Sequence, residues 1–404
     1  MATPFTIKIE QSAIDDLKRR LERTRLPDHI SGSHWDYGTD PSYLQEMLQY
    51  WITTYDWRAQ EAQLNRSLHH FKLPVNTIDL HFVHERSQNK DAIPLVLIHG
   101  WPGSILEFTE LIPQLVNPGE GKQAFHVVAP SLPGFAFSSA PKHKGFGLKE
   151  MAKTFNQLML ELGYIKYVAQ GGDWGSMLSK ALGIFHPDHC KGIHVNMLAA
   201  SPCLYNPRHL LQAANAYLPY ADQFPIFLTA EEISWLKDTK RFMDHESAYQ
   251  EQQSTKPQTL GYALNDSPAG LLGWLLEKFH QWSDRREADG QVPYSKDFLI
   301  TNTCLYWLTG NVTSSLRIYY ESKHTGDRTD IVSKQYCKVP TAVAVFPKEI
   351  YKMPKNWGTS LYNLQQWTVY SKGGHFAAKE EPEVLAQDMQ KFFGNKAIFG
   401  QIFF

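Results

Sequence analysis

Cysteine is scarce in this sequence, and its positions follow no recognisable spacing. The four cysteines lie far apart and form no C-x-x-C motif: Cys190, Cys203, Cys304 and Cys337. This pattern indicates neither a disulfide framework nor a zinc site. We therefore expect a reducing compartment, and we expect the protein to work without a metal or a cofactor.

Long apolar runs and a surplus of one charge are also missing. No stretch approaches the roughly 18 uninterrupted apolar residues of a membrane span, and residues 1–10 lack the apolar region of a signal peptide. Forty basic and forty-one acidic residues give a net charge of −1, without a long block of like charge. This argues against nucleic acid or a membrane surface as partner. We expect a soluble, cytoplasmic protein with a small neutral substrate.

Length and composition predict one main domain with additions. The 404 residues are 43% hydrophobic and 13% aromatic, which is ample material for a large buried core. An amphipathic helix is predicted from Ser12, as its N-cap, to Pro27, with Leu26 on its apolar face. The aromatic residues of 35–57 are expected to be buried against a neighbouring domain. Residues 78–85 alternate as an antiparallel strand would.

Short runs rich in valine and isoleucine begin after residue 90 and alternate with helical stretches. Each run ends in glycine, proline or a polar residue, and the first four are residues 94–100, 125–134, 167–173 and 192–197. This alternation predicts an α/β fold with a mainly parallel sheet wrapped in helices. Ligands of such a sheet gather at the carboxyl ends of the strands.

A long insertion with helical periodicity interrupts this rhythm. It predicts a helical cap, or lid, over the sheet, and strands resume at 341–347 and 367–371. The chain is therefore expected to divide into four parts. These are an N-terminal helical and aromatic meander (1–75), the first part of the α/β core (76–202), the helical cap (203–335) and the second part of the core (336–404).

The sequence GGDWGS, at 171–176, has the spacing of a nucleophile elbow, G-x-S-x-G, with an aspartate in place of the serine. The motif by itself is weak, because Gly-Asp-Gly clusters are common in turns. It follows a predicted strand and precedes a predicted helix, however, where a strained turn would hold Asp173 over a cavity. Glu349 and His375 each follow a later strand, so nucleophile, acid and histidine stand in the chain order of a triad.

The sequence resembles the microsomal-type epoxide hydrolases in six segments. They are HGWPGS (99–104), GGDWGS (171–176), FPKE (346–349), GGHF (373–376) and the cap segments 254–279 and 306–322. The resemblance covers nearly the whole chain, including the N-terminal meander, and it implies the α/β-hydrolase fold. The membrane-anchoring helix of the animal microsomal enzymes has no counterpart here, so we expect a soluble member of the family.

The resemblance implies a role for each member of the triad. Asp173 matches the nucleophile, His375 the base that deprotonates the hydrolytic water, and Glu349 the acid that orients the histidine. A carboxylate, with an ordinary pKa of about 3.9, is ionised at neutral pH and needs no base to attack a strained carbon. Its ester carbonyl belongs to the enzyme, so water can release the product, whereas an ether on serine would be a dead end.

The resemblance also implies groups that stabilise charge and donate protons. The backbone N–H groups of Trp101 and Trp174 match the oxyanion hole. Tyr249 and Tyr319 match two cap tyrosines that hydrogen-bond the epoxide oxygen. A phenol with a pKa near 10 is protonated at neutral pH and can act as the acid.

Three functions remain in competition. The favoured one is hydrolysis of a small apolar epoxide, with water, to a vicinal diol. A haloalkane or haloacetate dehalogenase would share the aspartate, the oxyanion tryptophan and the histidine, but halide leaves without a proton and prefers N–H donors. A non-catalytic scaffold that binds a small apolar molecule would have a broken triad, and every member is present here. We expect a monomer or a homodimer.

Overall fold

One sheet forms the centre of the protein. The structure is a computed structural model that describes residues 1–203, 205–217, 228–285 and 292–403. Within these residues, nine strands pair in the order β1-β2-β3-β5-β4-β6-β7-β8-β9. The strands are β1 (Thr3–Pro4), β2 (His70–Val75), β3 (Ile78–Glu85), β4 (Ile93–Ile98), β5 (Phe125–Pro130), β6 (Tyr167–Gly171), β7 (Cys190–Val195), β8 (Cys337–Val345) and β9 (Tyr362–Val369).

The sheet is mainly parallel, as predicted. The pairings from β5 through β4 and β6 to β9 are parallel, whereas β1, β2 and β3 add an antiparallel edge. Central strands can be continuous apolar runs because both of their faces are buried. In β4, Leu95 and Leu97 join one apolar cluster, and Val96 and Ile98 join the other.

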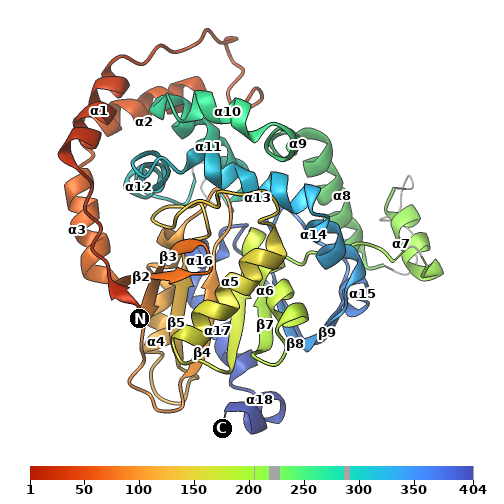
Figure 1. Ribbon diagram of the computed structural model, residues 1–404. Helices are drawn as coiled ribbons and strands as arrows, with labels where there is room; N and C mark the ends of the chain where they lie inside the picture. Colours follow the sequence, from red (N-terminus) through yellow and green to blue (C-terminus); the bar gives the residue numbers. More distant parts are fainter. Residues whose placement is uncertain (204, 218–227, 286–291, 404) are drawn as a thin grey trace.

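Helices cover both faces of the sheet (Figure 1). α5 (Leu148–Glu161) and α6 (Asp173–Phe185) pack into one apolar cluster, and α4 (Leu111–Val116) and α17 (Pro382–Phe393) into the other. The predicted arrangement of a mainly parallel sheet wrapped in helices is therefore confirmed. Shorter elements complete the core: η1 (Ile105–Phe108), α15 (Lys355–Thr359), α16 (Ala377–Glu380) and α18 (Lys396–Phe403).

Most of the described residues between β7 and β8 are helical. Figure 1 shows α9 to α13 arching over one end of the sheet. The elements are α7 (Pro207–Tyr217), α8 (Ala230–His245), α9 (Ala248–Thr255), α10 (Pro257–Leu264), α11 (Pro268–Trp282), α12 (Lys296–Trp307), α13 (Val312–His324), α14 (Asp327–Thr329) and the π-helical turn η2 (Asp330–Lys334). These helices form the cap.

The N-terminal chain runs along the outside of the cap (Figure 1). It contains α1 (Gln11–Glu22), α2 (Pro41–Thr53) and α3 (Trp57–Ser67), and both α1 and α2 contact α11. The predicted burial of the aromatic residues of 35–57 holds for Trp51 and Trp57, and the Tyr55 hydroxyl lies 3.0 Å from Thr301 Oγ1 of α12. It is wrong for Tyr37, which is 80% exposed.

Two details predicted for α1 are wrong. The N-cap is Glu10, which makes no side-chain capping bond, and Ser12 lies inside the helix. The helix ends at Glu22, before Pro27 is reached, and Leu26 is exposed. The reason is packing: the apolar face that contacts the rest of the protein comes from Ile14 to Leu21, so nothing holds a further turn.

The division of the chain into four parts stays a prediction. Its first boundary, at 75/76, falls in the turn of the hairpin between β2 and β3. β1 pairs with β2, so the N-terminal part contributes two strands to the edge of the sheet.

Candidate active site

Asp173 lies at the turn between β6 and α6. Its φ of +47° is in the left-handed region, where a residue with a β-carbon is strained. The neighbouring glycines are required because backbones approach closely. A Cβ on Gly171 would lie 2.3 Å from the backbone of Gly175, and a Cβ on Gly175 would lie 2.0 Å from the carbonyl oxygen of Ile98. The G-x-D-x-G spacing is thus a steric requirement of this turn.

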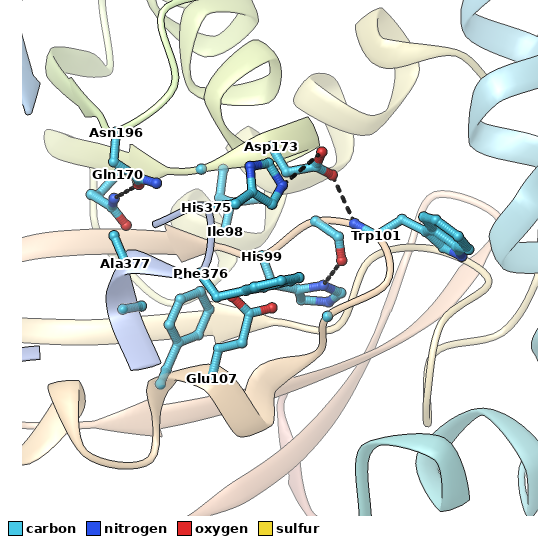
Figure 2. A pocket seen from close by; sticks show the side chains of 15 residues that line it. Ile98, His99, Trp101, Glu107, Gln170, Asp173, Asn196, His375, Phe376 and Ala377 are labelled. Atoms are coloured by element: carbon cyan, nitrogen blue, oxygen red, sulfur yellow. Dashed lines mark hydrogen bonds and ion pairs between the residues drawn. The ribbon is translucent and has the colours of Figure 1, made fainter. Parts of the chain in front are cut away.

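The loop after β4 supplies a hydrogen-bond donor to the carboxylate. The backbone N–H of Trp101 donates to Asp173 Oδ1 at 2.8 Å (Figure 2). The N–H of Trp174 belongs to the first turn of α6, where amides have no acceptor within the helix. Gly100 permits the close approach, since a Cβ there would lie 2.1 Å from Asp173 Oδ1. The Trp101 N–H can stabilise negative charge on Asp173 Oδ1, and the same role for the Trp174 N–H stays a prediction.

Cap helix α12 holds this loop in place. Tyr306 Oη donates to the Gly103 carbonyl at 2.6 Å, and Asn302 Nδ2 donates to the Pro102 carbonyl at 2.9 Å. Ser104 Oγ donates in turn to Asn302 Oδ1 at 2.8 Å. All three side chains are buried. The position of the Trp101 amide therefore depends on the cap as well as on the sheet.

His375 and Glu349 approach Asp173 from two other strand ends. His375 follows β9, and Glu349 follows β8. His375 Nδ1 lies 2.8 Å from Glu349 Oε1, and His375 Nε2 lies 3.4 Å from Asp173 Oδ2. The backbone N–H of Ile350 also donates to Glu349 Oε1, at 2.7 Å. An ionised Glu349 accepts only, so Nδ1 carries a proton and Nε2 faces Asp173.

The charge of His375 depends on the two carboxylates beside it. Burial by itself lowers the pKa of His375, but Glu349 and Asp173 together outweigh burial and raise the pKa to about 10. The ring is therefore an imidazolium at neutral pH as long as Asp173 is charged. Any reaction that neutralises Asp173 would lower the pKa of His375 and make it a better base.

Two cap tyrosines lie near the same carboxylate. Tyr249 of α9 and Tyr319 of α13 are both buried. The Tyr249 ring stacks on the Trp101 ring at 5.4 Å, and the Tyr319 ring meets the Trp174 ring edge-on at 4.7 Å. Burial, with the charge of Asp173 adding to it, raises the pKa of both phenols well above the usual range. Both hydroxyls therefore stay protonated and can donate to a bound oxygen.

Glu107, which was not predicted as a site residue, lies behind the triad. It belongs to η1 and lines a cavity of about 20 Å³ together with Gln170, Asp173, Asn196 and His375 (Figure 2). That volume suffices for about one water molecule. Burial raises the pKa of Glu107 to about 8, so the acid is mostly neutral at pH 7. Its position just after the HGWPGS segment is its only sequence signal.

The structure thus places every predicted site residue around one carboxylate. The residues are Trp101, Asp173, Trp174, Tyr249, Tyr319, Glu349 and His375, and their individual roles stay predictions. Among the described residues, no cluster of histidine, cysteine, aspartate or glutamate side chains could hold a metal ion. In the same part of the chain, every helix is too short or too polar to pass through a lipid bilayer.

A mainly parallel sheet, an elbow after β6, a histidine after β9 and a helical cap define an α/β hydrolase. In agreement, the family model for the alpha/beta hydrolase fold matches residues 93–382. A second family model, Epoxide hydrolase N terminus, matches residues 2–108. The predicted α/β-hydrolase fold is therefore confirmed.

Comparison with known proteins identifies the family within the α/β hydrolases. The chain is 37% identical to Epoxide hydrolase 1 of Sus scrofa over 406 residues, which cover 97% of this chain and 88% of that protein. The structure superposes on juvenile hormone epoxide hydrolase from the silkworm Bombyx mori with a TM-score of 0.88, at 34% identity, covering 98% and 94% of the two chains. For Aspergillus niger epoxide hydrolase the TM-score is 0.84, at 31% identity, covering 98% and 96%. The chain belongs to the epoxide hydrolases.

Proposed function

We propose that the protein hydrolyses small apolar epoxides to vicinal diols in two steps, through an ester on Asp173. The observation that carries the proposal is the set of groups around one carboxylate. An N–H donor lies on one oxygen of Asp173, an imidazolium lies beside the other, and two protonated phenols of the cap lie near it. Paired phenols suit an alkoxide, which needs a proton to leave, whereas a halide does not.

In the first step, Asp173 attacks a carbon of the epoxide ring. Trp101 holds Oδ1, so Oδ2 is the oxygen available for attack. The new bond forms between Oδ2 and carbon, the carbon–oxygen bond of the ring breaks, and the departing oxygen takes a proton from Tyr249 or Tyr319. The products of this step are a neutral ester, a hydroxyl group on the same substrate and a tyrosinate.

In the second step, water releases the diol. Esterification removes the negative charge of Asp173, so the pKa of His375 falls and the ring can lose its proton, which restores the tyrosine. Neutral Nε2 then deprotonates a water molecule that attacks the ester carbonyl. Trp101 and Trp174 amides stabilise the resulting oxyanion. The oxyanion then collapses, the bond between the Asp173 acyl carbon and Oδ2 breaks, and the diol leaves with the proton of the added hydroxyl. Asp173 is again a carboxylate, and Glu349 balances the positive charge that returns to His375.

We propose further that one chain is a complete catalytic unit, acting as a monomer or a homodimer in the cytoplasm. Every group used above comes from the same chain, which supports this. Light scattering coupled to gel filtration gives the mass in solution, and the activity per chain should not change with protein concentration. A loss of activity on dilution, together with dissociation, would contradict independent subunits.

Product assays separate the competing functions. The protein is incubated with styrene oxide and, separately, with a chloroalkane, and diol and halide are measured. We expect diol from the epoxide and no halide. Halide release without diol would favour a dehalogenase, and binding without either product would favour a non-catalytic scaffold.

The ester itself can be trapped. His375→Gln should accumulate the alkylated enzyme, seen as a substrate-sized mass increase of the intact protein that peptide mapping assigns to Asp173. The double variant with Asp173→Asn should show no increase. Full loss of activity in His375→Gln without any adduct would place His375 in the first step and contradict the proposed order.

A further inference from the structure

A buried ammonium lies against the ring of Tyr249. Lys278 belongs to α11, and only 4% of its side chain is exposed. Its Nζ lies 4.6 Å from the centre of the Tyr249 ring and 5.4 Å from that of Trp274. The carboxylate of Glu277 pairs with the same Nζ. Neither step of the proposed reaction has yet used this lysine.

The cap does not need a charge at this place in order to pack. Burial lowers the pKa of Lys278, and the carboxylates of Glu277 and Glu246 oppose that effect. An apolar side chain of similar length would fill the same space without desolvating an ammonium. A charge that forms nearby during the reaction would explain the lysine better than packing does.

The two cap tyrosines differ in their surroundings. Tyr249 has Lys278 over its ring, and Gln250 Nε2 donates to its hydroxyl at 3.3 Å. The Tyr319 ring meets Trp101 edge-on at 5.8 Å. The Tyr319 hydroxyl lies beside Tyr249 and Trp174, and within the described residues no cation lies over the Tyr319 ring. Negative charge on the phenol is therefore better stabilised at Tyr249.

We propose that Lys278 is a positioning residue that acts through Tyr249 and makes Tyr249, rather than Tyr319, the proton donor of ring opening. This inference rests on the proposed function. As Asp173 bonds to the ring carbon, the electron pair of the breaking carbon–oxygen bond takes the phenolic proton of Tyr249. The phenolate that remains spreads its charge over the ring that the ammonium covers. It regains a proton when His375 gives up its own, and Tyr319 only hydrogen-bonds the substrate oxygen.

The test measures alkylation alone, in the His375→Gln background where the ester accumulates. Rapid mixing with styrene oxide and intact-mass detection give the limiting alkylation rate and the substrate Kd. We expect Lys278→Met to lower the limiting rate about tenfold, as for the loss of a desolvated cation–π contact, and to leave Kd unchanged. Lys278→Gln, which keeps a polar end toward Glu277, should lower the rate to a similar extent.

Combined variants distinguish an effect through Tyr249 from a structural one. In the Tyr249→Phe background no phenolate forms, so adding Lys278→Met should slow alkylation by less than about twofold. In the Tyr319→Phe background, adding Lys278→Met should still slow alkylation about tenfold. Lys180→Met is the matched control. Lys180 is also fully buried, and its Nζ lies 4.1 Å from the ring centre of Tyr362 in β9. Its alkylation rate should stay within about twofold of the parent.

Three results would overturn the role of Lys278. The first is that Lys278→Met slows alkylation as much in the Tyr249→Phe background as in the parent. The second is that neither Lys278 variant changes the alkylation rate. The third is that both variants lose the cooperative thermal transition, which would make the lysine structural. The proposed function fails differently. If the His375→Gln parent forms no ester on Asp173, the two-step reaction is wrong, and the role of Lys278 falls with it.

Discussion

At the scale of single residues, the charge on Asp173 decides what its neighbour His375 can do. While Asp173 is ionised, it helps to raise the pKa of His375 to about 10 against the effect of burial, and the ring cannot accept a proton. Alkylation converts the carboxylate to a neutral ester. The histidine therefore becomes a base only when there is an ester to hydrolyse, which keeps the two steps in order.

Asp173→Asn is the direct prediction at this scale. The amide has no negative charge, so we expect diol formation to fall by at least about a thousandfold while the fold is kept. Gas chromatography measures the diol, and circular dichroism checks the fold. Intact-mass measurement excludes deamidation back to aspartate. Diol formation at the parent rate by protein that still carries asparagine would show that Asp173 is not the nucleophile.

A second residue-scale prediction concerns Glu107. The pKa of about 8 means that Glu107 is mostly neutral at pH 7, so Glu107→Gln keeps a neutral polar group of similar shape. We expect its ester hydrolysis to stay within about threefold of the parent, while Glu107→Ala, which leaves the cavity without that group, slows it about tenfold. Single-turnover decay of the ester measures both. Equal rates for parent, Gln and Ala would exclude Glu107 from the hydrolytic step.

Site residues could be predicted where the neighbouring sequence determines the local backbone geometry. Asp173 could be found because the elbow demands glycines around it, and His375 because it follows a strand and a glycine pair. Tyr249 and Tyr319 could be selected among nineteen tyrosines only through the resemblance, since helical periodicity does not tell which one meets the core. Glu107 was not predicted because the pattern of apolar and polar residues in the sequence does not show which charged residues are buried.

At the scale of elements, the cap supports the sheet's own loop. Asn302 and Tyr306 of α12 bind the carbonyl groups of Pro102 and Gly103, beside the Trp101 amide. A helix that is far along the chain thus fixes a donor that faces Asp173. The same contacts satisfy buried carbonyls that would otherwise lack a partner.

Asn302→Ala tests this link between cap and loop. It removes the donor to the Pro102 carbonyl and the acceptor of the Ser104 hydroxyl proton, so we expect the free energy of unfolding to drop by about 1–3 kcal/mol. We expect the limiting rates of the reaction to fall more than KM changes, because the displaced amide acts on charge that develops during the reaction. Denaturant unfolding and steady-state kinetics measure these effects. A stability loss with unchanged kcat would make the contact purely structural.

Elements were predictable where burial on both faces forces an apolar run. The parallel strands after residue 90 have that pattern and occur close to the predicted positions. β2 was missed because HFKLPV mixes lysine and proline with apolar residues, as an edge-side strand can. The start of α1 was misplaced because a serine at capping spacing is a weak signal beside the packing of Ile14 and Leu17.

At the scale of the whole molecule, buried histidines limit stability toward acid. Burial lowers the pKa of His84, His99 and His280 to about 4 in each case. These rings are neutral in the folded protein. As the pH falls, the same histidines take up protons at a higher pH in the unfolded chain than in the folded protein. Their contribution is present above about pH 6.5 and is lost as the pH falls toward 4.

At alkaline pH the effect on stability has the opposite direction, because other buried groups have raised pKa values. Burial raises the pKa of Glu380 to about 7 and that of Glu107 to about 8. A raised pKa means that the native state holds the proton more tightly than the unfolded state. Stability from these acids is present below their unfolded pKa and is lost as the pH rises through the folded values.

His375 extends this loss to higher pH, which gives the last prediction. Its contribution is complete below about pH 6.5 and disappears as the pH approaches the folded pKa of about 10. We expect the free energy of unfolding to decrease between pH 7 and 10 by an amount on the order of a few kcal/mol, since the buried imidazolium is held by two carboxylates. Guanidinium unfolding at several pH values measures the slope of the free energy of unfolding against pH.

In His375→Gln this slope should be flatter over the same pH range. His29 is exposed, so the control variant His29→Gln should have the slope of the parent. A slope that is the same in parent and His375→Gln would mean that the ion pair with Asp173 and Glu349 does not stabilise the folded protein.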